Sequence, residues 1–485
     1  MTHIAELLID GAWTLGADGR TVPLHSPVTG EHLAEVAMAT TDDVDAAVHT
    51  AAGAGADLME SMPPFERAAL LRRVADLLDE RSGELADTLT LEQGKPRHSE
   101  AADEVAESAE IFRWAAEEVI RLETPSLPGA DPNKLVLTHR RPNGVYALLT
   151  PWNFPMNIPA ELLAPALGGG NSLVFKPSEF TPLTAAGLVR AVLDAGFPPE
   201  AVHLLHGDAA VGASLVGHRG VDAVAFVGSA TTAEAVVRNA GLKRTLIEAS
   251  GNGPQIICDD ADLDAAAAAA VYGASFAGGQ CCVATERLLV QESVHDQVLE
   301  RILHHAEQAT LGDPREPTTV VGPLNNEAVA AQVDEHLADA RARGARILCG
   351  GERAPGFPTD LYWPLTVIDG VTTDMLLFTD ETFGPVLPIT TFTDDDEAVA
   401  LANDSNLGLQ AAVFTSSLRR AFHYVHRVRA GSIVVNDSTD FWEPHPPFGG
   451  ASRTDSGWGR IGGKYTLLDM TDLRTAVIDI QATRD

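Results

Sequence analysis

The sequence predicts an α/β fold class, with two doubly wound parallel-sheet domains and a small β-ribbon element. Three observations support this prediction: the length of 485 residues, two regions where short apolar strands alternate with helices, and two segments outside these regions in which apolar and polar residues alternate. One hydrophobic core rarely serves a chain this long. We expect residues 1–123 and 144–250 in the first domain, 251–452 in the second, and 124–143 with 466–485 in the ribbon.

The N-terminal quarter shows helical patterns from about residue 40. Asp42-Asp43-Val44 opens an Ala-rich helix, Pro63-Pro64-Phe65-Glu66 starts a second, and Ala101 to Leu122 forms a third. The alternating segments follow later, at Lys134 to Arg140 and at Arg474 to Gln481. Unpaired strand edges favour association, so these segments predict a subunit-pairing element. Two ordinary edge strands are the alternative.

The most orderly stretch runs from residue 145 to 249, where continuous apolar strands are separated by helices. This pattern is typical of a parallel sheet that is buried on both faces. The expected strands are Val145 to Leu149, Ser172 to Lys176, Val202 to Leu205, Ala223 to Val227 and Thr245 to Ala249. The second region, about 251 to 450, has the expected strands Arg287 to Val290, Arg346 to Cys349, Leu409 to Phe414 and Ser432 to Val435.

Composition narrows the classes of partner. The chain has 34 basic and 68 acidic residues, a formal charge of -34, which repels nucleic acid and anionic membranes. The N-terminus lacks the basic and apolar segments of a signal peptide, and the most apolar stretch, 265–279, is shorter than a membrane span. We therefore expect a soluble, cytoplasmic protein. Four cysteines, two of them adjacent, fit neither a disulfide framework nor a metal site.

Ligands of doubly wound sheets bind at the carboxyl ends of the strands. Gly228-Ser229 leads into a helix near Thr231, and the N-terminus of a helix suits a pyrophosphate. Lys176 can bond ribose hydroxyls, and Glu179 can accept from an adenosine 2′-hydroxyl while repelling a 2′-phosphate. These residues predict NAD rather than NADP, without the usual Gly-x-Gly-x-x-Gly fingerprint.

A pair of residue types suggests covalent catalysis. Cys281 and Cys282 lie in a small-residue turn, and Glu248 closes an apolar strand just before Gly251. A thiol can form a covalent intermediate that a carboxylate base then helps to hydrolyse. Taken singly, either residue is more often an inert buried cysteine or a solvated strand-end glutamate.

Seven motifs in order give the chain its resemblance to the NAD(P)-dependent aldehyde dehydrogenase superfamily, over nearly its whole length. They are Pro151-Trp-Asn-Phe-Pro155, Phe175-Lys-Pro-Ser-Glu179, Phe226-Val-Gly-Ser229, Glu248 with Gly251, Gly279-Gln-Cys-Cys282, Glu381-Thr-Phe-Gly-Pro385 and Pro447-Phe-Gly-Gly450. The resemblance implies that Cys282 is the nucleophile, Glu248 the general base and Asn153 the side-chain donor of the oxyanion hole. It also implies a homodimer or homotetramer.

The resemblance extends to the cofactor and substrate contacts. The implied cofactor contacts are Trp152, Lys176, Ser178, Glu179, Gly228, Ser229, Glu381 and Phe383. The implied substrate contacts are chiefly Phe154, Phe276, Cys281, Trp442 and Phe448, with Asn157, Ile158, Glu161, Val283 and the loop 440–443 nearby. Two positions differ from the common family pattern: Asn252 stands where many relatives have lysine, and Ala233 where a glycine is common.

Aromatic anchors without an arginine favour an apolar or aromatic aldehyde over a dicarboxylic semialdehyde. A cationic amino-aldehyde would be favoured if Glu161 and Glu443 faced inward, whereas we expect both to be solvated. CoA-acylating relatives generally lack a glutamate at the position of Glu248, and no phosphate site for a phosphorylating enzyme is evident. A non-catalytic scaffold would be expected to have lost Cys282, Asn153 or Glu248.

Overall fold

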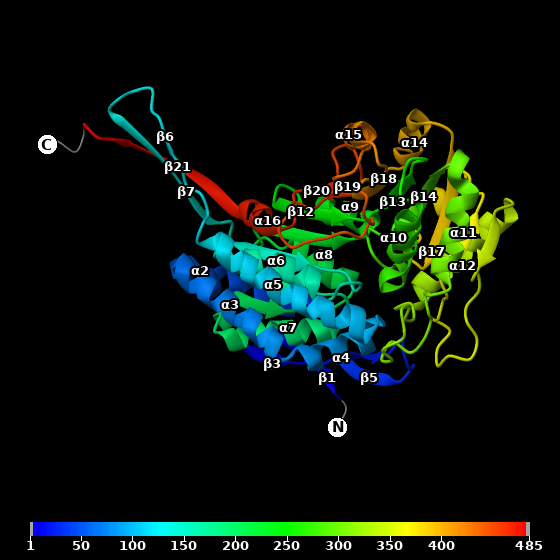
Figure 1. Cartoon of the computed structure of the whole chain (residues 1–485). Helices are drawn as coiled ribbons and strands as arrows, with labels where there is room; N and C mark the ends of the chain where they lie inside the picture. Colours follow the sequence, from blue (N-terminus) through cyan, green and yellow to red (C-terminus); the bar gives the residue numbers. More distant parts are fainter. Residues whose placement is uncertain (1–2, 482–485) are drawn as a thin grey trace.

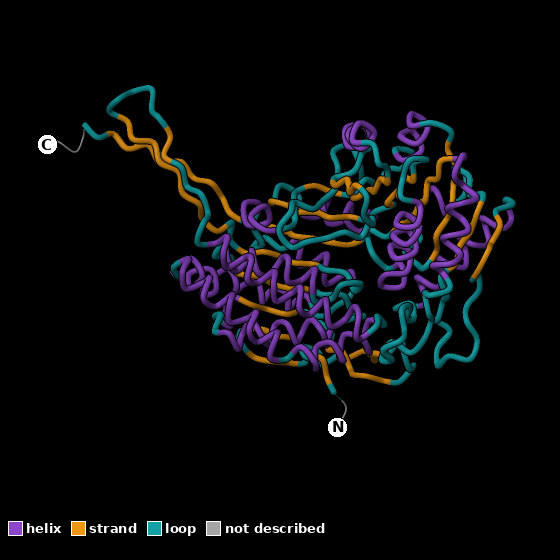
Figure 2. Tube along the Cα trace, in the orientation of Figure 1, coloured by secondary structure: helices purple, strands orange, loops and turns teal. Residues whose placement is uncertain are grey.

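The computed structural model describes residues 3–481 (Figure 1). Residues 1–2, at the start of the N-terminal segment, and residues 482–485, at the end of the predicted ribbon element, lie outside the described part. The described chain forms two large sheets covered by helices, a small N-terminal sheet and a ribbon that projects from the body (Figures 1 and 2). No helix in residues 3–481 is long and apolar enough to cross a membrane.

The five strands expected between residues 145 and 249 form the centre of an eight-stranded sheet. They run parallel to one another in the order β12-β11-β8-β9-β10. Their bounds differ from the expected ones by no more than one residue: β8 (Val145–Leu149), β9 (Ser172–Lys176), β10 (Val202–Leu204), β11 (Ala223–Gly228) and β12 (Arg244–Ala249).

Sequence reasoning missed the antiparallel edges of this sheet. They are β2 (Leu7–Ile9), β3 (Ala12–Thr14) and β20 (Gly457–Trp458). These strands are only two or three residues long, too short to show a period of two. The N-terminal strands β1 (Ile4–Ala5), β4 (Thr21–His25) and β5 (His32–Ala37) were also missed, and they form a separate three-stranded sheet.

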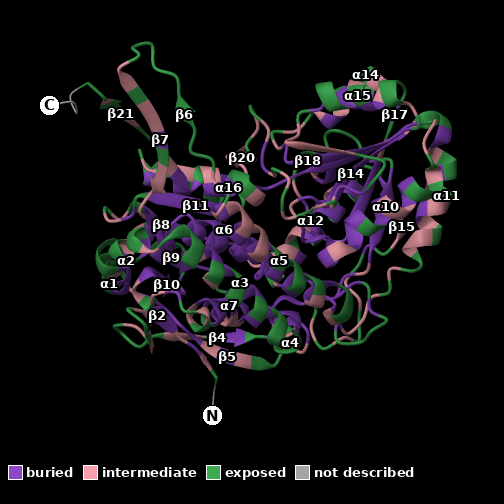
Figure 3. Cartoon of the chain, turned by 60° about the vertical axis from the view of Figure 1, so that its left-hand side comes forward, coloured by how far each residue is buried: buried purple, intermediate pink, exposed green. Residues whose placement is uncertain are grey.

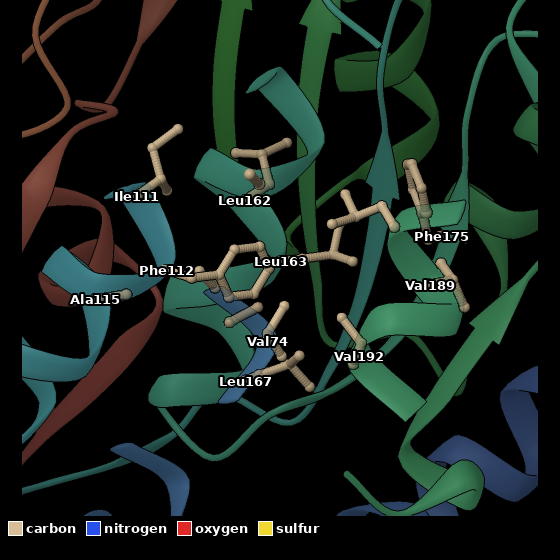
Figure 4. Close-up of a cluster of buried hydrophobic side chains, with 14 of the residues drawn as sticks. Val74, Ile111, Phe112, Ala115, Leu162, Leu163, Leu167, Phe175, Val189 and Val192 are labelled. Carbon is tan, nitrogen blue, oxygen red and sulfur yellow. The ribbon is translucent and has the colours of Figure 1, made fainter. Parts of the chain in front are cut away.

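Helices cover both faces of the first sheet, because alternate side chains of its strands point to opposite sides. Tyr146 and Leu148 of β8 join the core beneath one helical layer, whereas Val145 and Ala147 join the core beneath the other. Figure 4 shows the first core, around Phe112. Its layer contains α3 (Pro64–Glu80), α4 (Ser82–Gln93), α5 (Ala102–Val119), α6 (Asn157–Gly168) and α7 (Pro182–Ala195). The opposite layer contains α1 (Thr41–Thr50), α8 (Ala209–Gly217) and α9 (Ala230–Ala240).

The second sheet has seven strands in the order β15-β16-β17-β14-β13-β18-β19, parallel except at β15. The central strands of both large sheets are buried (Figure 3). The strands are β13 (Gly253–Ile257), β14 (Thr285–Gln291), β15 (Arg346–Cys349), β16 (Thr366–Asp369), β17 (Val386–Phe392), β18 (Gln410–Phe414) and β19 (Ser432–Val435). The helices around them are α10 (Leu263–Ser275), α11 (His295–Ala306), α12 (Glu327–Ala342), α13 (Leu376–Thr379), α14 (Asp395–Ala402) and α15 (Leu418–Arg427).

The two alternating segments pair with each other. Strand β21 (Thr471–Asp479) runs antiparallel to β7 (Lys134–Pro142), and the short strand β6 (Ser126–Leu127) joins the other side of β7. The second segment begins at Thr471, three residues before the expected start, and follows helix α16 (Gly463–Asp469). The pairing of the two segments is confirmed, and their role in subunit contact stays a prediction.

Connections between the sheets set up the site. Strand β12 ends at Ala249 and β13 begins at Gly253, so the chain passes from the first sheet to the second within residues 250–252. The predicted domain boundary at residue 251 falls in this passage, and the division into domains stays a prediction. Strands β13, β14 and β17 are parallel neighbours, so the loops that precede them meet at one edge of the second sheet.

Candidate active site

The adjacent cysteines lie in the loop that leads into β14. This loop follows a tight turn, Phe276–Gly279, in which Ala277, Gly278 and Gly279 all have positive φ. A side chain at Gly279 would place its Cβ 2.1 Å from the carbonyl oxygen of Gly384. The turn therefore needs glycine both for its conformation and for its contact with the loop before β17. Cys281 is buried, and Cys282 is half-buried.

Gly251 joins the loop of Cys281 and Cys282 to the passage between the sheets. A Cβ on Gly251 would lie 1.9 Å from the carbonyl oxygen of Cys282, so only glycine allows this approach. The N–H of Gly251 donates a hydrogen bond of 2.9 Å to Oε1 of Glu381. Three loops that are distant in sequence therefore meet at this one residue.

Glu248 lies one residue before the end of β12 and is 2% exposed. Its Oε1 has no hydrogen-bond partner among the described residues. Burial, and after it the nearby Glu381 carboxylate, raise the pKa of Glu248 to about 8, while the interaction with the Cys282 thiol lowers it. A carboxyl group whose pKa lies near the working pH is suited to accept and return a proton.

The Cys282 thiol is held in its neutral form. The interaction with the Cys281 thiol, burial and the Glu248 charge together keep the pKa of Cys282 well above the usual range for a thiol. The thiolate is the reactive nucleophile. A reaction at Cys282 therefore requires that the thiol proton move to another group.

Asn153 follows β8 and is buried beside the nucleophile loop. Its Nδ2 donates a hydrogen bond of 3.0 Å to the carbonyl oxygen of Gln280, and its Oδ1 has no partner in the described chain. A primary amide has two N–H groups, so one remains for an oxygen of a substrate. Asn153, Glu248 and Cys282 line one cavity of about 210 Å³, together with Trp152, Gly228, Ser229, Glu381 and Phe383.

Sequence reasoning missed the residue that shapes the turn at Glu381. Glu286, which is 2% exposed, accepts hydrogen bonds from the backbone N–H groups of Thr382 (3.1 Å) and Phe383 (2.8 Å). Phe383 has a φ of 58°, a conformation that this carboxyl group helps to hold. The Phe383 ring meets that of Trp152 edge-on at a centroid distance of 5.6 Å. A buried glutamate within the apolar strand β14 was the available signal.

A second missed residue fixes the same turn from helix α12. Nε2 of Gln332 donates hydrogen bonds of 2.7 Å to the carbonyl oxygen of Glu381 and 3.3 Å to that of Thr382. Its position on the polar face of a helix gave no signal in the sequence.

Five of the eight expected cofactor contacts line a cavity of about 320 Å³ at the carboxyl ends of the first sheet. It contains Lys176, Ser178, Glu179, Gly228 and Ser229. Ser229 caps α9 by accepting from the N–H of Thr232 at 3.3 Å. Burial lowers the pKa of Lys176, and Nζ of Lys176 lies 4.0 Å from the Glu179 carboxylate. A helix N-terminus, a lysine and a solvent-facing carboxylate fit a dinucleotide.

The two departures from the family pattern are accommodated away from the reacting groups. Ala233 is buried in the core between α9 and the first sheet, and it is not part of the 320 Å³ cavity. Asn252 is buried, and its Nδ2 donates a hydrogen bond of 3.1 Å to the carbonyl oxygen of Phe378. Its carbonyl oxygen accepts from the buried Arg287 side chain.

A third cavity, of about 360 Å³, leads to Cys282 from the other side. The structure brings together there all five expected substrate contacts: Phe154, Phe276, Cys281, Trp442 and Phe448. Glu161 also lines it and is 8% exposed, so the expectation that Glu161 is solvated is wrong. Its place on α6, one turn after Asn157, directs it to the cavity. Glu443, in contrast, is exposed as expected.

The contact at Gly251 gives a direct prediction. Gly251→Ala should lower aldehyde-dependent NADH formation by at least about a hundredfold, because a displacement of the nucleophile by about 1 Å costs roughly that much. Gly83→Ala is the matched control, since its new Cβ would have only the flexible Arg97 side chain nearby, at 3.8 Å. Both purified variants are assayed by NADH absorbance, and their folding is checked by circular dichroism. A folded Gly251→Ala protein with full activity would contradict this role of the contact.

The comparisons with known proteins agree with this geometry. The sequence model of the aldehyde dehydrogenase family matches residues 13–476. A solved NAD-dependent aldehyde dehydrogenase from Sinorhizobium meliloti is 36% identical, with a TM-score of 0.95, covering 99% of this chain and 95% of that one. A succinate-semialdehyde dehydrogenase from Burkholderia pseudomallei is 33% identical, with a TM-score of 0.95 and coverage of 99% and 98%. An indole-3-acetaldehyde dehydrogenase solved with NAD+ is 35% identical, with a TM-score of 0.95 and coverage of 98% and 96%. The chain therefore belongs to the aldehyde dehydrogenase family and oxidises an aldehyde with a nicotinamide cofactor.

Proposed function

We propose that the chain uses NAD to oxidise its aldehyde to the carboxylic acid, through a thioester on Cys282. The observation that supports this most directly is the single cavity shared by Asn153, Glu248 and Cys282. It joins a nucleophile, an amide donor and a carboxyl base, which together are the parts that covalent acyl chemistry requires.

The first half of the reaction forms the adduct. The Cys282 thiol loses its proton, for which the interacting Glu248 carboxylate is a suitable acceptor, and the sulfur attacks the aldehyde carbon. The carbonyl oxygen becomes negative and accepts hydrogen bonds from the free N–H of Asn153 and the backbone N–H of Cys282. One such donor is typically worth about a hundred- to a thousandfold in rate.

The second half releases the product. When bound, the cofactor supplies the hydride acceptor, and loss of hydride from the adduct carbon leaves a thioester on Cys282. After the proton taken from the thiol has passed to solvent, Glu248 takes a proton from a water molecule that attacks the thioester carbon, and it returns this proton to the sulfur. The carbon–sulfur bond breaks, the acid leaves and the thiol is restored. The presence of a glutamate at position 248 favours hydrolysis of the thioester over transfer of the acyl group to a second thiol.

The residues present fit NAD as the cofactor. Gly228 and Ser229 line the cleft at the start of α9, where a pyrophosphate would lie, and the expected ribose contacts Lys176, Ser178 and Glu179 line the same cleft. Glu381 and Phe383 lie on the side nearer Cys282 with Trp152, where they would hold the nicotinamide ribose and ring. The Glu179 side chain is 44% exposed and would meet a 2′-phosphate with a like charge.

The chain is further proposed to form a homodimer or homotetramer through its ribbon. Strands β7 and β21 expose the apolar side chains Leu135, Leu473, Val477 and Ile478, and an exposed apolar strand pair favours association. Light scattering of the pure chain checks this, because the mass of a single chain would contradict it.

Substitution of each cysteine tests the nucleophile. Cys282→Ala should abolish NADH formation with any aldehyde, because no atom remains to form the adduct. Cys281→Ala should keep most of the activity, because Cys281 lines the cavity and raises the pKa of Cys282 but forms no bond to the substrate in this proposal. Activity is read as NADH absorbance over a panel of aldehydes. An equal loss of activity in the two variants would contradict the assignment of Cys282, rather than Cys281, as the nucleophile.

Cofactor choice is tested by comparing kcat/KM for NAD and NADP. We expect a preference for NAD of at least about tenfold, since one unfavourable charge contact of roughly 1.4 kcal/mol gives that ratio. Glu179→Gln should reduce this preference for NAD. Glu234→Gln, on the exposed side of α9 and paired with Arg238, removes the same charge outside the cleft and should leave the ratio as it was. If the unmodified protein used both cofactors with equal kcat/KM, the proposal for NAD would be contradicted.

A further inference from the structure

The cavity that leads to Cys282 is lined by carboxyl groups. Among the described residues that line it, eight are acidic and none is lysine, arginine or histidine. The acidic residues are Glu100, Asp103, Glu104, Glu107, Glu161, Glu248, Asp437 and Asp440. Asp103, Glu107 and Asp437 are exposed at the mouth, whereas Glu100, Glu161 and Glu248 are buried. Carboxyl groups therefore line the cavity from the mouth to the catalytic end.

One of these carboxyl groups already has its cation. Nζ of the buried Lys95 lies 2.6 Å from Oε2 of Glu104, and it also lies 3.8 Å from the centre of the Phe154 ring. Oε1 of Glu104 accepts from the backbone N–H groups of Met156 and Asn157 at 2.9 and 3.1 Å. Glu104 therefore positions the start of α6, and the other carboxyl groups give the cavity its charge.

Glu161 is the buried carboxyl group of the cavity that lacks compensation and, unlike Glu248, has no part in the proposed reaction. Its Oε1 has no hydrogen-bond partner in the described chain, and the side chain is 8% exposed. Burial, with a smaller effect from Glu248, raises the pKa of Glu161 to about 8, against an opposing interaction with Trp442. A buried polar group without a partner destabilises the protein. A ligand that supplies the missing partner removes this cost.

Aromatic rings line the cavity beside these carboxyl groups. The Phe276 ring lies between two others, with centroid distances of 5.8 Å to Phe154 and 5.6 Å to Tyr272. The faces of aromatic rings attract cations, with an energy of about 0.5–2 kcal/mol per contact. Ring faces and carboxyl groups together are complementary to an organic cation with apolar substituents.

We propose that the aldehyde substrate carries a positive charge, as an ammonium or quaternary ammonium group separated by a short carbon chain from the carbonyl, and that Glu161 is the residue that selects it. The proposal rests on the proposed function, because Cys282 and Asn153 must hold the carbonyl at the other end of the substrate. The expectation of an apolar or aromatic aldehyde rested on the rings, and the carboxyl groups of α5 were not part of it.

The same features disfavour other ligands of the cavity. A dicarboxylic semialdehyde would bring its carboxylate into a cavity that is already lined by eight acidic residues. A metal ion needs converging ligands, and no group of three His, Cys, Asp or Glu residues within 3–481 is placed to hold one. An organic cation needs only a diffuse negative field, and its approach favours the ionised form of Glu161.

Pairs of aldehydes that differ only in charge test the proposal. Trimethylammonioacetaldehyde is compared with 3,3-dimethylbutanal, and 4-(trimethylammonio)butanal with 5,5-dimethylhexanal, in which carbon replaces nitrogen. We expect kcat/KM to favour the cation by at least about tenfold in one pair or both, and to be lowest for succinic semialdehyde. If the isosteric neutral aldehyde is used as well as the cation in both pairs, the proposal is overturned, while the proposed function stands. Failure to oxidise any aldehyde would instead contradict the proposed function.

Variants locate the selectivity. Glu161→Gln keeps the size of the side chain and should reduce the cation-to-neutral ratio of kcat/KM by about tenfold. Glu110→Gln is the control, because Glu110 lies on α5, is exposed and pairs with Arg113 outside the cavity, and its ratio should not change. A ratio that is unaffected by Glu161→Gln in an active protein overturns the role of Glu161. Equal reductions in both variants would show a general surface effect and overturn it as well.

Discussion

The site depends on the close approach between Gly251 and the carbonyl of Cys282. Strands β13 and β14 are parallel neighbours, so the residues just before them are forced together. The carbonyl oxygen of Cys282 then lies where any side chain at Gly251 would be. The same glycine donates its N–H to Glu381. One residue that has no side chain therefore positions the loop of Cys282, the end of strand β12 that carries Glu248, and the loop of Glu381.

Buried carboxyl groups set the electrostatics around this contact. Glu248 and Glu381 are close enough that the charge of one raises the pKa of the other, and Glu286 holds the turn between Glu381 and Phe383. No lysine, arginine or histidine lines the Cys282 cavities in the described chain. We propose that the Glu248 carboxylate, which interacts with the thiol, can take the thiol proton, and water can take it where that carboxylate is absent. This separates the site from those in which a histidine activates a cysteine.

Much of the fold could be predicted because the buried strands carry a continuous apolar signal. The central strands β8 to β12 and the paired segments at β7 and β21 follow from that pattern and from alternation. The antiparallel edge strands could not be predicted, because β20 has only two residues and its pairing with β12 depends on tertiary contact.

The candidate site was predictable only where motifs carried it. The positions of Cys282, Glu248 and Asn153 followed from the family resemblance, and the structure brings them into one cavity, although their catalytic roles await experiment. Sequence reasoning missed the acidic residues that line the cavity leading to Cys282. Glu100, Asp103, Glu104 and Glu107 have the spacing of one helical face, but such a stripe usually faces water. Only the packing of α5 against α6 shows that it borders a cavity.

The division of labour between Cys282 and Glu248 is tested most directly by pre-steady-state kinetics of Glu248→Gln. Mixing this variant with NAD and an aldehyde should give a burst of NADH of up to one equivalent per site, followed by a slow steady state. Mass spectrometry should then detect acylated Cys282, because hydrolysis lacks its base. The rate of the burst reports whether Glu248 also takes the thiol proton. A folded, NAD-binding variant that gives neither burst nor thioester would show that Glu248 acts before hydride transfer, which contradicts its role in hydrolysis.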